Sequence, residues 1–186
     1  MCNLYIQITD ELRKIEAYLT DEFKRDQQIN SLYEIVQYNQ FVLPRLYMMI
    51  TVGVVYLNAN ILPRCELLRD MNEMCRGIQH PMRGLFLRNY LLQAVKNSLT
   101  TSFDSPISDG QSDDFSMNPL DFILMNFCEM NKLWVRLQYQ GHSKEQAIRE
   151  QERKELKLLV GTNILRLSQL TNLSLETYAE SITVRL

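Results

Sequence analysis

The sequence has few of the residues from which metal sites and disulfide frameworks are built. It holds two histidines, His80 and His142, and four cysteines. The cysteines are scattered along the chain: Cys2, Cys65, Cys75 and Cys128. None of them has the close paired spacing that zinc sites use. We therefore expect buried thiols, and neither a metal site nor a disulfide.

Excess charge of one sign and long apolar runs are also scarce. The formal net charge of −2 gives no general attraction to nucleic acid or to anionic lipid. The longest stretch without charge, 46–63, is interrupted by Asn58, Asn60 and Pro63. A bilayer span takes about 20 predominantly apolar residues, so this stretch is not predicted to cross a membrane. The chain does not start with a basic segment and an apolar block, as a secretory leader would, which predicts a cytosolic protein.

What the sequence does contain is apolar spacing of the helical kind. Apolar residues three or four apart predict helices over about 3–24, 29–41, 44–58, 63–77, 81–98 and 118–140. Ser143 and Gln146 form a capping-box pattern before a further helix, whose mixed charges, such as Glu150 with Lys154, predict a solvated face. Ser174 is placed to cap a last, partial helix. Strict alternation hardly appears, so the predicted fold class is all-α.

Residues about 100–118 differ from the rest in composition. Serine, glycine and acidic residues gather there, including Asp104, Asp109, Asp113 and Asp114. Too little of this segment can be buried to offset the entropy of ordering it, so we expect a flexible acidic loop within a single domain spanning 1–186. Such a loop is either a plain solvated connector or a binder of a basic partner.

One segment combines an apolar helix with a misplaced charge. Pro44 suits a first helical position, because its missing N–H would have no intrahelical partner there. Arg45, in that first turn, is disfavoured by the helix dipole by about 0.3–1 kcal/mol. Leu46, Tyr47 and Met48 follow it. Two explanations remain open: Arg45 pairs with a carboxylate of its own fold, or it receives an acceptor from another protein.

A second basic group surrounds His80. Phosphate chemistry at the start of a helix near His80 is one hypothesis, because helix N-termini attract anions. The sequence places no glycine-rich cradle, nucleophile or carboxylate pair beside it. The alternative is that Arg76, Arg83 and Arg88 tie adjacent helices together by hydrogen bonds to carbonyls and carboxylates. No other constellation indicates catalysis or a cofactor, so a non-enzyme is predicted.

Several long motifs appear in a fixed order. They are Tyr-Leu-Thr-Asp-Glu-Phe at 18–23, Pro-Arg-Leu-Tyr at 44–47, Met-Cys-Arg-Gly-Ile-Gln-His-Pro-Met-Arg-Gly-Leu-Phe-Leu-Arg-Asn-Tyr-Leu-Leu at 74–92, Asn-Phe at 126–127, Glu-Met-Asn-Lys-Leu-Trp-Val-Arg at 129–136 and Leu-Val-Gly-Thr-Asn at 159–163. In these motifs the chain resembles the vacuolar protein sorting-associated protein 35 family, the large scaffold subunit of the retromer complex. The resemblance weakens at 99–119 and after 170.

The resemblance implies an αα-hairpin solenoid of the HEAT type, of which this chain holds part of the N-terminal end. It implies that Pro44, Arg45, Leu46 and Tyr47 dock an arrestin-like subunit, vacuolar protein sorting-associated protein 26. Met48 stands where the family usually has leucine, a swap of similar volume that keeps the site. The expected function is scaffolding in endosome-to-Golgi retrieval, with no cofactor.

Further partners are implied by the same resemblance. They are a PX-domain sorting nexin, cargo tails and a late-endosomal Rab GTPase, with membrane contact only indirect and a location on endosomes. The phosphoesterase-like subunit, vacuolar protein sorting-associated protein 29, is not expected to bind, because the far C-terminal solenoid is absent. A short form that occupies one partner without linking it to the coat is the alternative. Apolar residues after 172, such as Leu175, Tyr178 and Ile182, predict an exposed apolar C-terminal face.

Overall fold

The computed structural model describes residues 2–25, 31–60, 63–101, 119–139 and 146–169. Within these ranges the chain forms eight helices and no strand. Their bounds are α1 (Cys2–Arg25), α2 (Leu32–Gln37), α3 (Val42–Ala59), α4 (Arg64–Cys75), α5 (Pro81–Ala94), α6 (Lys96–Thr101), α7 (Pro119–Tyr139) and α8 (Gln146–Ser168). The all-α fold class predicted from the sequence is confirmed.

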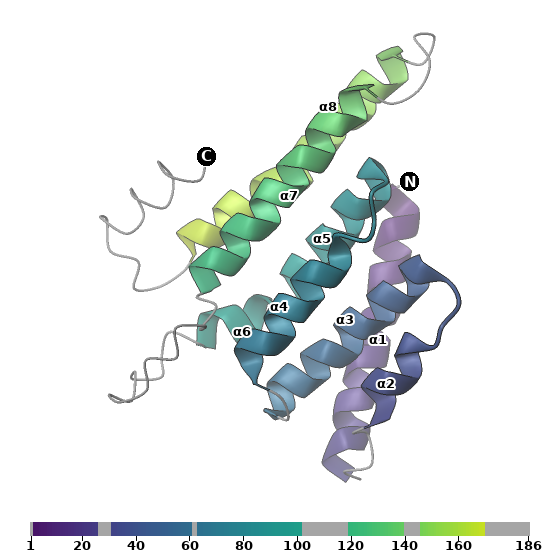
Figure 1. Cartoon of the computed structure of the whole chain (residues 1–186), viewed down its shortest axis with the longest axis vertical. Helices are drawn as coiled ribbons and strands as arrows, with labels where there is room; N and C mark the ends of the chain where they lie inside the picture. The colour runs from purple at the N-terminus through teal and green to yellow at the C-terminus, as the bar shows by residue number, and fades with distance from the viewer. Residues whose placement is uncertain (1, 26–30, 61–62, 102–118, 140–145, 170–186) are drawn as a thin grey trace.

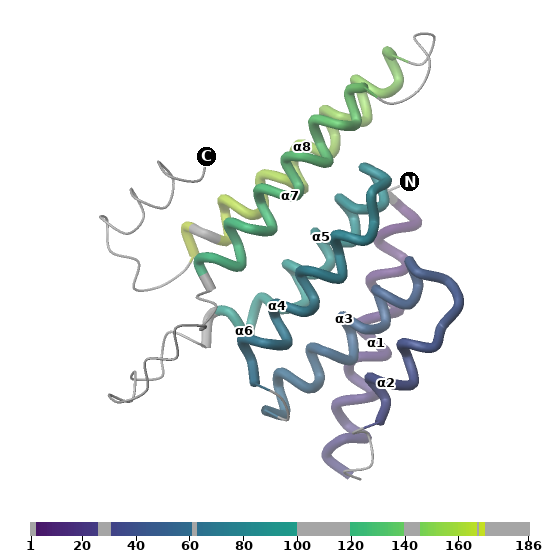
Figure 2. Tube along the Cα trace, in the orientation of Figure 1, coloured from purple at the N-terminus to yellow at the C-terminus, as the bar shows by residue number. Residues whose placement is uncertain are grey.

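The helices lie side by side in a stack. Figures 1 and 2 show this stack running from α1 and α2 through α3, α4 and α5 to the long hairpin of α7 and α8. Helix α3 packs on α1, α2, α4 and α5, and α5 packs in turn on α7 and α8. Sequential packing of helix pairs, each contacting its neighbours in the stack, is the architecture of an α-solenoid.

Helix α3 lies at the centre of the larger apolar cluster. It is buried almost all round, with Ile50, Val52, Val54 and Leu57 each at most 2% exposed. By length and composition alone α3 is apolar enough to cross a membrane, but 61% of that stretch is buried inside the fold. A helix that is apolar on all sides is expected at the centre of a packed fold, where its neighbours cover it.

Two glycines allow helices to approach closely. A Cβ on Gly53 of α3 would lie 2.8 Å from Sδ of Met71 in α4. A Cβ on Gly84 of α5 would lie 2.8 Å from Cδ1 of Leu133 in α7 and 3.0 Å from the Ile78 carbonyl oxygen. Both distances are below ordinary van der Waals contact, so the spacing of α5 and α7 depends on the missing side chain at Gly84.

Several predicted helix boundaries are wrong. Helix α3 begins at Val42, so Pro44 is its third residue and not its first; a missing N–H is still harmless there, because the first four have no intrahelical acceptor. Pro63 is the N-cap of α4 and not a residue of its first turn. The helix predicted over 29–41 is only α2, which ends at Gln37 and leaves Phe41 exposed.

The helix predicted over 81–98 is divided into two. Helix α5 ends at Ala94, and Val95 (φ −85°, ψ 1°) separates it from α6, which extends to Thr101 inside the predicted acidic loop. The bend places Val95 and Leu99 both in the core, at 0% and 2% exposure. The rest of that loop, the Ser143 cap, the helix after Ser174 and the apolar C-terminal face lie outside the described residues.

Candidate functional site

The turn between α2 and α3 holds the predicted partner-binding motif. Tyr38 is the C-cap of α2, and Phe41 is the N-cap of α3 in an extended conformation (φ −90°, ψ 116°). Asn39 Oδ1 accepts a hydrogen bond from the Phe41 N–H at 3.0 Å, which shapes the turn. In the described part of the chain, the N-cap Phe41 makes no side-chain capping hydrogen bond at the start of α3, so it leaves the first N–H groups of this helix uncapped.

The five predicted residues do not share one environment. Pro44 is exposed and Arg45 is half-buried, whereas Leu46 is only 5% exposed and belongs to the core. Tyr47 and Met48 are half-buried and pack against the same core. The predicted group thus splits into a surface pair, Pro44 and Arg45, and three side chains that hold α3 in place.

Tyr47 is held on the inner side by aromatic and polar neighbours. Its ring centroid lies 5.2 Å from that of Tyr90 in α5, with the rings tilted by 47°. Burial raises the pKa of the Tyr47 phenol above its ordinary value. The Tyr90 hydroxyl in turn lies 2.8 Å from Thr51 Oγ1, so the aromatic pair joins α3 to α5. Tyr47 therefore fixes the position of the helix that carries Arg45.

Arg45 donates to carbonyl oxygens of the turn and not to a carboxylate. Its Nη1 lies 3.4 Å from the carbonyl oxygens of Gln37 and Asn39. Among the described residues, no ion pair involves Arg45. Both hydrogen bonds are long for N–H···O geometry, and the guanidinium has further donors. The own-fold carboxylate that the sequence left open is not found in the described part of the chain.

Sequence reasoning missed the apolar residues around Arg45. Tyr38 is 86% exposed and Phe41 70% exposed, and Val42 is also exposed. With Pro44 and Arg45 they form what we call the α2–α3 surface, defined as Tyr38, Phe41, Val42, Pro44 and Arg45. Large exposed apolar side chains in the same turn as a cation are typical of an interaction site. The signal in the sequence was the polar Asn39-Gln40 break just before Phe41, which ends α2 too early to bury it.

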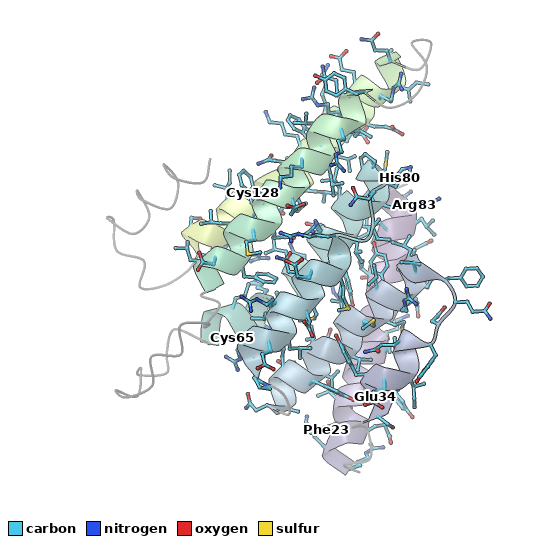
Figure 3. All side chains as sticks on the ribbon, in the orientation of Figure 1. Phe23, Glu34, Cys65, His80, Arg83 and Cys128 are labelled. Atoms are coloured by element: carbon cyan, nitrogen blue, oxygen red, sulfur yellow. The ribbon has the colours of Figure 1, made fainter. Side chains whose placement is uncertain are left out.

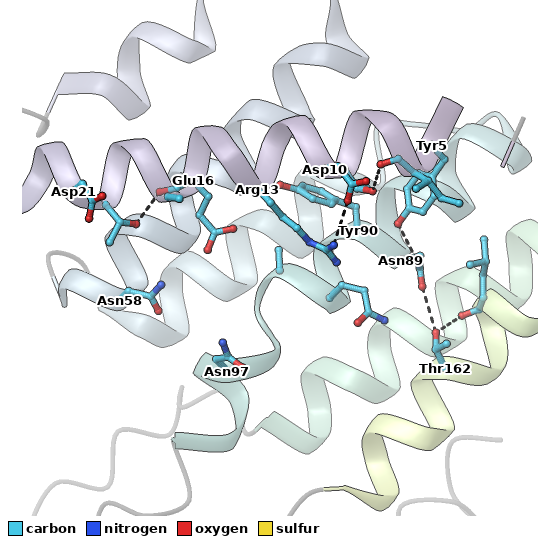
Figure 4. Close-up of a pocket in the computed structure, with 17 residues that line it drawn as sticks. Tyr5, Asp10, Arg13, Glu16, Asp21, Asn58, Asn89, Tyr90, Asn97 and Thr162 are labelled. Carbon is cyan, nitrogen blue, oxygen red and sulfur yellow. Dashed lines mark hydrogen bonds and ion pairs between the residues drawn. The ribbon is translucent and has the colours of Figure 1, made fainter. Parts of the chain in front are cut away.

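A larger groove lies elsewhere, between α1, α5 and α8. It has a volume of about 790 Å³, and Figure 4 shows polar side chains along it. Tyr5 Oη accepts from Asn89 Nδ2 at 2.8 Å, and Asn89 Oδ1 accepts from Thr162 Oγ1 at 3.3 Å. Arg13 pairs with Asp10 at 3.4 Å. These side chains are hydrogen-bonded or ion-paired to one another. The groove therefore does not present them as a set of reactive groups.

A polar network crosses the seam between α4, α5, α7 and α8. Arg88 is 1% exposed, and its Nη1 donates to Asn72 Oδ1 at 2.8 Å and to Asn126 Oδ1 at 3.3 Å. Asn126 Nδ2 donates onward to Asn163 Oδ1 at 2.9 Å. Burial lowers the pKa of the Arg88 guanidinium. The prediction that arginines tie adjacent helices is confirmed for Arg88, although amide oxygens take the place of carboxylates.

His80 and the described cysteines occupy structural positions. Figure 3 shows His80 and Arg83 together at the start of α5. There His80 is the N-cap, and its Nδ1 accepts a hydrogen bond from the Arg83 N–H at 3.5 Å. Cys65, Cys75 and Cys128 are thiols on α4 and α7. Cys75 is buried, as predicted, and burial raises its pKa to about 12, whereas Cys65 and Cys128 are only half-buried, contrary to the prediction. Within the described residues, no three His, Cys, Asp or Glu side chains gather as a metal site would require.

Comparison with known proteins gives a family match across the chain. Residues 2–186 match the family model described as Vacuolar protein sorting-associated protein 35. The chain is 45% identical over 183 residues to Vacuolar protein sorting-associated protein 35A of Arabidopsis thaliana, an alignment covering 98% of this chain and 23% of the relative. It is 46% identical over 179 residues to Vacuolar protein sorting-associated protein 35 of Dictyostelium discoideum, covering 96% and 22%. For the protein of that name from Schizosaccharomyces pombe, the identity is 44% over 186 residues, covering 96% and 21%. The chain spans less than a quarter of the length of these relatives.

Proposed function

Since this chain belongs to the vacuolar protein sorting-associated protein 35 family, we propose that it is a scaffold segment of the retromer complex in endosome-to-Golgi retrieval. In this proposal the α2–α3 surface docks the arrestin-like subunit, vacuolar protein sorting-associated protein 26. The role is non-catalytic and needs no cofactor. It is carried out in the cytoplasm and peripherally on endosomal membranes.

The observation that carries the proposal is the environment of Arg45. Its guanidinium is half-exposed at a turn, its contacts are two weak hydrogen bonds to carbonyl oxygens, and exposed Tyr38 and Phe41 lie in the same turn. Interfaces concentrate their binding energy in a few arginine and aromatic anchors surrounded by apolar contacts. An edge strand of an arrestin-like β-sandwich offers the carbonyl acceptors that such an arginine needs.

The burial pattern divides the motif into two roles. Pro44 and Arg45 face the partner together with Phe41, while Leu46 and Tyr47 hold α3 against the core and Met48 packs beside them. Substitution of Leu46 would therefore disturb the fold before it disturbed the interface. This makes Arg45 and Phe41 the informative positions for a binding experiment.

The same family membership extends the proposal to further partners. They are a PX-domain sorting nexin, cargo tails and a late-endosomal Rab GTPase, so that membrane contact is made through partners and not by this chain. No nucleic-acid role is proposed, because the net charge is −2.

The test is a binding titration of this chain against the purified arrestin-like subunit. Arg45→Ala should weaken binding by about thirtyfold, the equivalent of an anchor contributing about 2 kcal/mol. Phe41→Ser should also weaken it. Arg83→Ala removes an exposed arginine from a different helix and serves as the charge-matched control, with affinity unchanged. All variants should keep the far-UV circular dichroism of the wild type; an Arg45→Ala affinity equal to that of Arg83→Ala would refute the interface.

Co-purification shows whether this chain binds one small subunit, both or neither. Because the phosphoesterase-like subunit is proposed to bind a distant part of the scaffold, this chain should retain the arrestin-like subunit alone. Retention of both small subunits would contradict the proposal that they bind different parts of the scaffold. Retention of neither, with the helical signal intact, would contradict the docking site itself.

A further inference from the structure

A second cavity lies on the face formed by α4, the turn before α5, and α7. Its volume is about 180 Å³. Four cationic side chains line it, and they are Arg76, Arg88, Lys132 and Arg136. The carboxylate in its lining belongs to Glu129. None of these residues belongs to the α2–α3 surface, so this cavity is independent of the proposed docking site.

The inner wall of the cavity holds a cation with an unused donor. Arg88 is 1% exposed, and its Nη1 is shared between the side-chain oxygens of Asn72 and Asn126. Its Nη2 is buried and has no hydrogen-bond partner among the described residues. Both acceptors of Nη1 are neutral amides. A buried guanidinium in this position lacks the anion that normally offsets its desolvation.

Glu129 acts on Arg88 only through longer-range charge attraction, because Lys132 and Arg76 hold its carboxylate. Its Oε1 lies 2.7 Å from Lys132 Nζ and 3.9 Å from Arg76 Nη2. Partial burial raises the pKa of this carboxyl, but the hydrogen bond from Lys132 and the charges of Lys132, Arg88 and Arg76 outweigh it and hold the pKa below its ordinary value. The cavity therefore keeps an excess of positive charge after its own carboxylate is paired.

Hydrogen bonds and an ion pair orient the side chains at the rim of the cavity. Arg136 Nη1 donates to Gln79 Oε1 at 2.6 Å, which joins α7 to the turn before α5. Arg76 is held by Glu73 at 2.7 Å. Arginine forks suit the oxygens of phosphate and carboxylate groups, and fixed forks lose less entropy on binding. A volume of about 180 Å³ admits one such group with part of its hydration, and is too small for a nucleotide.

We propose that this cavity binds a single phosphate group, held by Arg88 from within and by Arg76 and Arg136 at the rim. The group can belong to free inorganic phosphate or to a phosphorylated inositol headgroup, since both present at least three terminal phosphate oxygens. Binding would give the unused Arg88 donor an acceptor and would join α4, α5 and α7 through one ligand. The site is distinct from His80, whose Nδ1 is an acceptor at the helix start.

The test is a thermal-shift and calorimetric titration with inorganic phosphate, with ionic strength held constant by chloride. We expect a saturable rise in the melting temperature with phosphate and none with chloride. Arg136→Gln should weaken phosphate binding by about tenfold or more, because it removes a charge-assisted donor. Arg83→Gln, which removes the same charge outside the cavity, should bind as the wild type does.

Two further arms make the result decisive. Because Arg88→Gln can fail to fold, the rim variant Arg136→Gln carries the test once its circular dichroism matches the wild type. Inositol 3-phosphate is titrated beside inorganic phosphate: tighter binding identifies the headgroup as the source, and equal or weaker binding identifies free phosphate. No saturable response to either ligand, or equal loss in Arg136→Gln and Arg83→Gln, would overturn the site.

Discussion

The centre of α3 and the seam around Arg88 solve the packing problem in opposite ways. Around α3 the contacts are almost entirely apolar, with Ile50 and Val52 at most 1% exposed. At the seam of α4, α5, α7 and α8, a buried arginine and three asparagines meet instead, at 0–1% exposure. Both regions are equally buried. The region around α3 is stabilised by buried apolar area, and the seam is stabilised by directional hydrogen bonds.

The two regions should differ in how well they tolerate substitution. Apolar contacts have no direction, so a core such as that around α3 accepts other side chains of similar volume. Hydrogen bonds between buried amides hold only when each donor faces its acceptor, so a seam built from them fixes the register of the helices. A stack of similar helical hairpins has many nearly equivalent ways to slide, and the seam excludes most of them.

The largest effect should come from the apolar region. Leu91, fully buried in α5, packs into the larger cluster. Leu91→Ala should lower the free energy of unfolding by about 2–5 kcal/mol, measured by urea denaturation followed by circular dichroism. Leu91→Met, similar in volume, is the control and should cost less than about 1.5 kcal/mol. A loss above about 1.5 kcal/mol for Leu91→Met would show that this region tolerates substitution as poorly as the seam does.

A smaller loss of stability is expected at the seam, where the effects of neighbouring substitutions should be coupled. Asn126→Leu deprives Arg88 Nη1 of one acceptor and Asn163 Oδ1 of its donor. Arg88 Nη1 keeps Asn72 as an acceptor, so Asn163 Oδ1 is the group left unsatisfied, at a cost of about 1–3 kcal/mol. Because Asn126 and Asn163 bind one another, the double variant Asn126→Leu with Asn163→Leu should cost less than the sum of the single variants. Strict additivity in urea unfolding would contradict a connected network.

Two glycines give a matched pair for the same comparison. At Gly84 a Cβ would meet Leu133 and the Ile78 carbonyl, whereas at Gly161 in α8 it would meet nothing within 4 Å. Gly161→Ala should stabilise the chain by about 0.5–1 kcal/mol through helix propensity. Gly84→Ala should be less stable than Gly161→Ala by about 1–3 kcal/mol, because α5 and α7 must separate. Equal melting temperatures for the two variants would mean that α5 and α7 can move apart at little cost in stability.

The smallest effect is on the acid side of the pH profile. The folded-state pKa of Glu129 lies below its ordinary value, despite partial burial that raises it, because Lys132, Arg88 and Arg76 favour the carboxylate. Its contribution to stability is therefore present above the ordinary carboxyl range and is lost as the pH falls through the lowered pKa. Glu129→Gln should flatten this part of the profile, measured as melting temperature against pH. Glu150→Gln, which removes a carboxylate from an exposed pair with Lys154, serves as the control.

The sequence predicted the larger features of the fold and missed finer ones. The apolar periodicity predicted the bounds of α1, α3 and α7 to within a few residues, because a helix with a buried face needs apolar residues three or four apart. The start of α3 was placed two residues late, since proline suits any position in the first turn and not the first alone. The bend at Val95 left no local signal, because it is set by the core on both sides.

The candidate sites were predictable only in part. The Pro44–Arg45 pair was visible as a charge at the start of an apolar helix, but an all-round apolar helix does not reveal which face points inward, so Leu46 and Tyr47 could not be separated from Arg45. Arg76, Arg83 and Arg88 looked alike in the sequence. Only the packing of α4 and α7 shows that Arg88 is buried and Arg83 exposed.

The bonds of Asn89 have a mechanical consequence. This one amide binds Tyr5 of α1 on one side and Thr162 of α8 on the other, joining positions 84 and 73 residues away. The first and last described helices are thus fastened to the same point of α5. We expect the described helices from α1 to α8 to move as one stiff block, because a bend between them would have to break the bonds of Asn89.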